Sequence, residues 1–267
     1  MTPASIAPIA PVAVRACTAT CACGTGLDAL AQALTANRSA LRRNDLPGLA
    51  LDTAIGRVDG LESMSWDEPA WDSRVTRLAR LSLQAEGFAD AVAAACARHG
   101  AARVGLVLGT SASTIAVTEA AYRSLTPEAD FPPALRHPAL NTPHAVADFA
   151  QRLLALQGPA LTVSTACSSG AKALAVAERW LRLGVADAVV AGGIDALSGS
   201  LLHGFASLQV LDARPCRPFH ASRQGISIGE GAAWLLLERG PGDVELRGWG
   251  ESVDAHHMSS PHPQGLG

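Results

Sequence analysis

Residues 161–193, LTVSTACSSGAKALAVAERWLRLGVADAVVAGG, carry the pattern of a strand, a turn, a helix and a second strand. Residues 161–164 are apolar and rich in strand-forming types, and residues 165–170 are all small. Apolar residues at helical spacing over 171–183 predict a helix. The continuous apolar run 186–191 is typical of a strand that is buried on both faces. We therefore predict a βαβ unit whose first strand and helix are joined by a turn of small residues.

Cys167 is the strongly nucleophilic side chain of this turn, and it lies where the strand meets the helix. A thiol at this place faces unpaired N–H groups at the positive end of the helix dipole, which favours the thiolate form. Its small neighbours leave room for a substrate carbonyl, and its own N–H can help to stabilise an oxyanion. The geometry suits acyl transfer through a thioester, and the alternative is an inert cysteine packed under the helix.

Four blocks of the sequence belong together: TACSSG at 165–170, ADAVVAGG at 186–193, the RPF, RQG and GEGA motifs within 217–232, and DAHHMSSP at 254–261. In this order and with this spacing, they resemble the blocks of the β-ketoacyl-acyl carrier protein synthases. The resemblance is close from residue 101 to the end and loose before it. It implies that Cys167 is the nucleophile that accepts the growing acyl chain.

The resemblance also implies an α/β fold of the thiolase-like type. The predicted order βαβαβαββ corresponds to the N-terminal half of that fold, with a mostly parallel five-stranded sheet, and the second half is largely missing. We expect residues 1–240 to form an N-terminal β-ketoacyl synthase domain and residues 241–267 to begin a truncated C-terminal half.

Periodicity and turn residues predict the remaining elements. We expect strands at 12–17, 103–109, 231–238 and 244–250. Helices are expected at Leu27–Thr35 and at 73–98, the latter with a break at Gly87, and two further helical pieces on either side of a Pro-rich loop at 131–143. Residues 44–72 should form a surface excursion and residues 194–211 a loop.

The synthases that the sequence resembles use two histidines, from Gly-Thr-Gly-Thr and Asn-x-Phe-Gly-Phe-Gly stretches, and a lysine between them. Neither stretch occurs in the 267 residues. The sole lysine, Lys172, lies five positions beyond Cys167 on the predicted helix and therefore points to roughly the opposite side. We expect the isolated chain not to condense an acyl group with malonyl-carrier protein.

Four further residues are assigned to substrate binding by resemblance. Ala112 stands where a bulkier residue limits acyl-chain depth in several synthases, which implies a roomier pocket. Phe205 falls on a loop whose phenylalanine flanks the acyl chain, and Ser259 and Ser260 match a loop near the pantetheine arm of the carrier. For Ala112 and Phe205 the alternative is ordinary core packing.

Two clusters have the residue types of metal ligands. Cys17, Cys21 and Cys23 form a C-x3-C-x-C pattern, and the tail contains three histidines, at 256, 257 and 262. For the cysteines we favour the alternative that they are small buried apolar residues, and the histidines belong to the block that resembles the synthases. We expect no metal, and no cofactor because a thioester carries its own activation.

Composition excludes some classes of function. A net charge of -3 argues against nucleic-acid binding, and no apolar run is long enough to span a membrane. The N-terminus lacks the basic start of a signal peptide, so we expect a cytoplasmic protein with free thiols. Charged residues make up 17% of the chain, below the usual share of about a quarter, which favours a surface that a partner covers.

The sequence supports a synthase-type acyltransferase of fatty-acid or polyketide-like biosynthesis whose partner is an acyl carrier protein loaded with acyl or malonyl groups. The alternative is a non-condensing, chain-length-factor-like subunit of a full-length synthase. A cysteine hydrolase is disfavoured, since Thr165 stands where a nucleophile elbow requires glycine. By resemblance, strand 161–164 lies at a sheet edge and pairs with its copy, so we expect a homodimer or a heterodimer.

Overall fold

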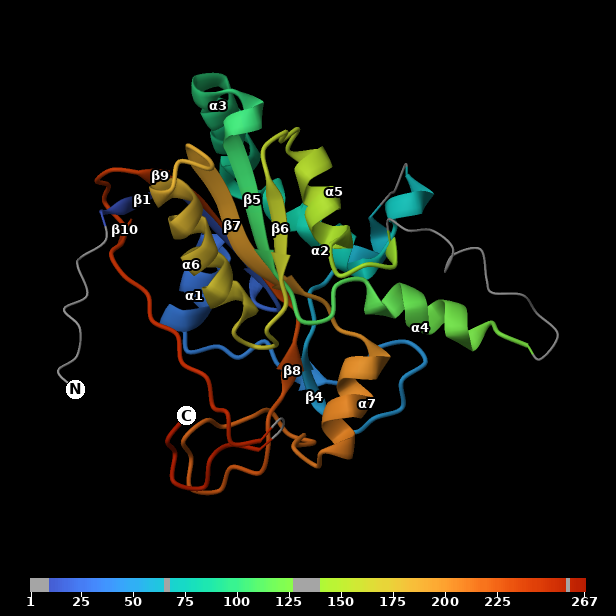
Figure 1. Ribbon diagram of the computed structural model, residues 1–267. Helices are drawn as coiled ribbons and strands as arrows, with labels where there is room; N and C mark the ends of the chain where they lie inside the picture. Colours follow the sequence, from blue (N-terminus) through green and yellow to red (C-terminus); the bar gives the residue numbers. More distant parts are fainter. Residues whose placement is uncertain (1–9, 65–67, 127–139, 258–259) are drawn as a thin grey trace.

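The computed structural model describes residues 10–64, 68–126, 140–257 and 260–267 (Figure 1). The strands are β1 (Val12–Cys21), β2 (Gly24–Thr25), β3 (Arg42–Arg43), β4 (Ala54–Gly56), β5 (Val104–Gly109), β6 (Ala160–Val163), β7 (Ala188–Asp195), β8 (Ile228–Gly229), β9 (Gly231–Arg239) and β10 (Glu245–Leu246). The α-helices are α1 (Leu27–Thr35), α2 (Arg74–Leu83), α3 (Phe88–His99), α4 (Ile115–Arg123), α5 (Ala145–Leu153), α6 (Ser169–Arg182) and α7 (Gly199–Ser207).

The central sheet has the order β10-β1-β9-β7-β5-β6, with β2 paired to the end of β1. β5, β6 and β7 are parallel, and β9 runs antiparallel between β7 and β1. β1 therefore points the same way as the three parallel strands. The predicted sheet of five mostly parallel strands is confirmed, and the two-residue strands β2 and β10 extend it to seven. β6 ends the order, as expected for an edge strand.

Helices cover both faces of this sheet (Figure 1). Leu106 and Leu108 of β5 belong to the core formed with α2, α3 and α5, whereas Val107 belongs to the core formed with α6. Successive residues of a strand point to opposite faces, so a strand with helices on both sides is apolar along its whole length. All of β5 is buried for this reason.

The helical stretch predicted over 73–98 is divided into α2 and α3. Ser73 caps α2, and its side chain accepts a hydrogen bond from the Thr76 N–H at 3.2 Å. Between the helices, Glu86 and Gly87 have φ values of 53° and 69°, which an α-helix does not contain. The break predicted at Gly87 is confirmed.

The loop predicted over 194–211 is wrong, because β7 continues to Asp195 and residues Gly199–Ser207 form α7. The start of α7 is stabilised from two directions. Ser198 accepts a hydrogen bond from the Leu201 N–H, and Glu119 of α4 accepts from the Gly199 N–H at 3.1 Å. Glycine at 199 and 204 lowers the helix propensity of this segment, and the cap from α4 is a tertiary contact that local sequence does not reveal.

Two other predictions need correction. Residues 44–72 are more than a surface excursion, since Ala54, Ile55 and Gly56 form the buried strand β4, which pairs with β3 and β8. The strand predicted at 244–250 is limited to β10, which pairs with the start of β1. Part of the Pro-rich loop predicted at 131–143 lies outside the described residues.

Candidate active site

Cys167 lies in the turn between β6 and α6 and is exposed. It directly precedes Ser168, the N-cap residue of α6, so its side chain is placed at the start of a 14-residue helix. The first N–H groups of a helix have no partner within the helix and carry its positive dipole end. The structure thus confirms the predicted place of the thiol between strand and helix.

The turn is held by its own polar side chains. The Ser169 hydroxyl donates to the Ala166 carbonyl at 2.6 Å and accepts from the Thr165 N–H at 2.8 Å. The Ser168 hydroxyl donates to the Thr165 carbonyl at 2.8 Å. Ala166 has φ 53°, in the left-handed region that costs a non-glycine residue about 1 kcal/mol or more. These bonds hold the chain in the kink from which Cys167 projects.

Glycines bring the start of α6 down onto the sheet. A Cβ atom at Gly109, the last residue of β5, would lie 2.4 Å from the main-chain carbonyl carbon of Ser169. A Cβ at Gly193 of β7 would lie 3.3 Å from the Cα of Gly170. Side chains at these positions would push the helix away, so the glycines fix how far Cys167 stands above the strand ends.

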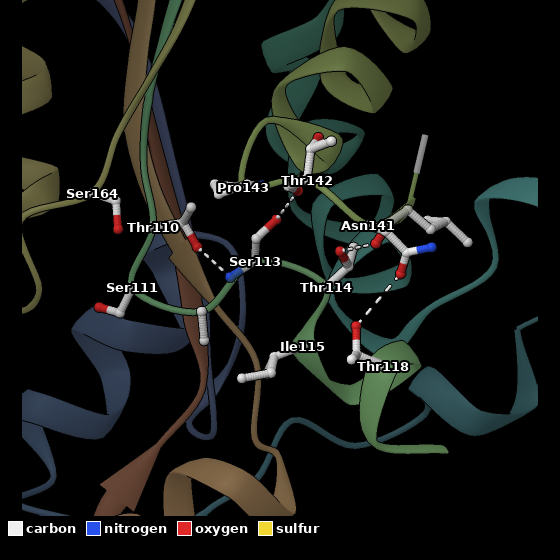
Figure 2. Close-up of a pocket in the computed structure, with 12 residues that line it drawn as sticks. Thr110, Ser111, Ser113, Thr114, Ile115, Thr118, Asn141, Thr142, Pro143 and Ser164 are labelled. Atoms are coloured by element: carbon white, nitrogen blue, oxygen red, sulfur yellow. Dashed lines mark hydrogen bonds between the residues drawn. The ribbon is translucent and has the colours of Figure 1, made fainter. Parts of the chain in front are cut away.

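A cavity of about 240 Å³ lies beside this turn (Figure 2). Its wall includes Ser164, which follows β6 three residues before Cys167, and Ala112, which was predicted to border substrate. The structure therefore brings Ala112 to the same end of the sheet as the nucleophile's turn.

Asp195 at the end of β7 holds the loop that carries Ala112. Its Oδ1 accepts hydrogen bonds from the Thr110 hydroxyl at 2.9 Å, the Ser111 N–H at 2.8 Å and the Ala112 N–H at 3.0 Å. The Thr110 hydroxyl in turn accepts from the Ser113 N–H at 3.0 Å. This role of Asp195 was not predicted from the sequence, although an acidic residue at the end of the buried run of β7 is a signal for it.

Two of the other predicted substrate-binding residues, Phe205 and Ser260, do not line this cavity. Phe205 is half-buried on α7, not on a loop as expected, and Ser260 is exposed in the C-terminal segment. Neither belongs to the cavity wall among the residues that the structure describes. Ser259 lies outside the described residues.

Lys172 lies on α6 with its side chain partly exposed and forms an ion pair with Glu251 at 2.8 Å. Glu251 also pairs with Arg179 at 3.0 Å, and these two partners lower the pKa of its carboxyl group. Arg179 stacks on Trp249 with its Cζ 3.9 Å from the ring centroid. These contacts hold residues 246–253 against α6. A second cavity of about 570 Å³ lies between this segment and the helix, next to Thr165 and Ser168.

The three cysteines at 17, 21 and 23 are less buried than predicted. Cys17 is exposed, and Cys21 and Cys23 are partly exposed. Burial and the neighbouring Cys21 raise the pKa of the Cys23 thiol. Burial also raises the pKa of Cys96. Both effects keep these thiols protonated, which lowers their reactivity.

Within the described ranges, His, Cys, Asp and Glu side chains form no cluster of three that would hold a metal ion. None of the helices in that part of the chain has the length and apolar character needed to cross a bilayer.

Comparison with known proteins agrees with this geometry. The family model described as "Beta-ketoacyl synthase, N-terminal domain" matches residues 10–241. Nodulation protein E of Rhizobium leguminosarum bv. trifolii is 34% identical over 179 residues, which cover 64% of this chain and 45% of that protein. 3-Oxoacyl-[acyl-carrier-protein] synthase 2 of Vibrio harveyi is 32% identical over 182 residues, which cover 62% and 44%.

A solved structure of a ketosynthase in complex with its chain length factor, from Xenorhabdus doucetiae, is similar with a TM-score of 0.82 and 33% identity. The match covers 97% of this chain and 65% of that one, and it confirms the predicted thiolase-like α/β fold. The chain spans less than half the length of the two curated relatives.

Proposed function

The chain belongs to the β-ketoacyl synthase family, and we propose that its Cys167 accepts an acyl group from an acyl carrier protein as a thioester. The observation that carries this proposal is the exposed thiol at the start of α6. Acylation of Cys167 would be the half-reaction that precedes condensation with a malonyl-carrier protein.

The acyl transfer needs no other reagent. The Cys167 thiolate attacks the carbonyl carbon of the acyl thioester, and the electron pair of the carbonyl moves onto its oxygen. When the carbonyl reforms, the carbon–sulfur bond to the carrier breaks and the carrier leaves as a thiolate. We propose that the main-chain N–H of Cys167 helps to stabilise the oxyanion between these steps.

We further propose that residues 1–240 act as the N-terminal domain of such a synthase and that residues 241–267 begin its C-terminal half. The extent of the matched family model supports this division, because it covers residues 10–241. Beyond that point β10 pairs with β1, and the segment that follows crosses α6 and is held there by Glu251.

A second candidate function is that of a non-condensing subunit paired with a full-length synthase. The edge strand β6 favours it, since β5 is the strand partner of β6 among the described residues and Leu161 is 40% exposed. An open apolar edge is a template for pairing with another strand. A similar structure is that of a ketosynthase bound to its chain length factor. The exposed Cys167 favours the acyltransferase, because a purely structural partner needs no thiol.

The experiment that tests acylation uses purified chain, an acyl-loaded carrier protein and peptide mapping by mass spectrometry. We expect one acyl group, on the peptide that contains Cys167, and none in Cys167→Ala. Cys17→Ala is the matched control because Cys17 is the other exposed thiol of the described residues, and it should be acylated like the wild type. Acylation that persists in Cys167→Ala would refute the assignment.

A further inference from the structure

Cys21 and Cys23 lie on either side of Ala22 in the hairpin that joins β1 to β2. Cys21, the last residue of β1, pairs with Gly24, the first residue of β2. Residues 22 and 23 therefore form the turn, and the chain reverses its direction within residues 21–24. Gly24 has φ 137°, which glycine adopts at little cost. The two cysteines are thus one residue apart at a sharp bend of the chain.

The bend brings the two thiols together. Two Cα–Cα steps of about 3.8 Å that meet at about a right angle span about 5.4 Å. A disulfide bridges Cα atoms that are about 4.4–6.8 Å apart, so this separation is suitable. Burial, the charge of Cys21 and a hydrogen bond between the two thiols raise the pKa of Cys23, so the sulfur atoms are neighbours in the reduced protein.

The pair is accessible to a small reagent, because both cysteines are partly exposed. The charge of Arg38 and a main-chain hydrogen bond from Ala40 favour the thiolate form of Cys23 and offset part of the effect of burial. A thiolate is the form of cysteine that reacts with oxidants.

The fold separates this pair from the third cysteine of the segment. Cys17 precedes Cys21 by four residues on β1, and at about 3.3 Å per residue their Cα atoms are about 13 Å apart. Cys23 lies beyond Cys21 in the turn. Neither cysteine can therefore form a disulfide with Cys17 while β1 is folded.

We propose that Cys21 and Cys23 form an oxidation site, which a hydroperoxide converts into a disulfide. One thiolate attacks hydrogen peroxide and the O–O bond breaks, which gives a sulfenic acid and, after uptake of a proton, one water molecule. The other thiol attacks the sulfenic sulfur, its proton and the hydroxyl group leave as a second water molecule, and the S–S bond forms. The two thiols together lose two protons and two electrons, and the peroxide is reduced. The site is independent of the acylation proposed for Cys167.

The test is oxidation of the folded chain followed by mass spectrometry. The chain is treated with hydrogen peroxide, its remaining thiols are blocked with N-ethylmaleimide in urea, and it is cleaved with trypsin. Residues 16–38 form one tryptic peptide that contains all three cysteines of the segment. We expect this peptide to lose two hydrogen atoms and to carry one N-ethylmaleimide group, on Cys17. Dithiothreitol before blocking should restore labelling of all three.

Serine variants provide the controls. Cys17→Ser should form the disulfide like the wild type. Cys21→Ser should form none in this peptide while it is folded, whereas the same variant oxidised in urea should form a Cys17–Cys23 disulfide, since β1 no longer holds these residues apart. Full labelling of Cys21 and Cys23 after peroxide treatment would overturn the proposal. A disulfide to Cys17 in the folded wild type would overturn it as well, and this measurement needs no variant.

Discussion

Gly109→Ala should displace the nucleophile's helix while leaving the chemistry of every side chain in the site unchanged. Gly109 has no left-handed φ, so its backbone tolerates alanine and only the added methyl group matters. That methyl would lie 2.4 Å from the carbonyl carbon of Ser169 and 2.6 Å from the Gly170 nitrogen. These are main-chain atoms of α6, which cannot turn aside as a flexible side chain would.

The magnitude follows from two opposing effects. Overpacking in a core costs about 1–3 kcal/mol, and a clash with main-chain atoms belongs at the upper end. Alanine also restricts the unfolded chain, which offsets about 0.5 kcal/mol. We expect the free energy of unfolding to fall by about 2 kcal/mol or more, and the alkylation rate of Cys167 to fall because its helix has moved.

Urea denaturation followed by circular dichroism measures the first quantity, and peptide mapping after brief labelling measures the second. Gly170→Ala is the matched control, since its Cβ would meet nothing nearer than 3.8 Å and lies within α6. It should be neutral or stabilise the protein by up to about 1 kcal/mol. If Gly109→Ala unfolds at the same urea concentration as the wild type, our account of the packing beneath Cys167 is refuted.

Three other predictions concern charge and thiol reactivity. Two arginines, Arg103 and then Arg239, hold the pKa of Asp187 well below its usual range, so the stability that this carboxylate contributes is present above its unfolded pKa of about 4 and is lost as the pH falls further. The difference in unfolding free energy between wild type and Asp187→Asn, measured by urea titration, should therefore shrink between about pH 4 and pH 2. A difference that stays constant over this range would contradict the stabilising role of the ionised Asp187. Asp195→Ala should cost about 2 kcal/mol of unfolding free energy, and Asp195→Asn, which keeps an acceptor oxygen, less than half of that; equal losses by the same titrations would contradict the capping role. Cys167 should react with iodoacetamide at pH 7 several-fold faster than Cys96, whose pKa is raised by burial, and peptide mapping that found the reverse order would exclude it as the activated thiol.

The elements that could be predicted from the sequence are those specified by residues within or next to them. The apolar run of β5 and the small residues before Cys167 specify a buried strand and a tight turn from within a few residues. The boundaries of α1 were predicted without error, because Gly26 precedes it and Asn37, with φ 47°, follows it in the conformation expected of a C-terminal cap.

The parts that could not be predicted depend on contacts between distant residues. α7 requires Glu119, which lies 80 residues before Gly199. The burial of β4 requires β8, which follows it by more than 170 residues. Ala112 was assigned by resemblance, but the carboxylate of Asp195 that fixes its loop is visible only once β5 and β7 are neighbours.

The position of β6 at the edge of the sheet links the reactivity of the Cys167 thiol to protein concentration. This four-residue strand has β5 on one side, and its other edge is not paired with any described strand. It also leads, through the turn at Ala166, directly to Cys167. A second chain that pairs with β6 would therefore contact the same segment that positions the Cys167 sulfur. Under the pairing proposed above, the rate of Cys167 modification per molecule would change with total protein concentration. Rates measured at different protein concentrations could then not be compared directly.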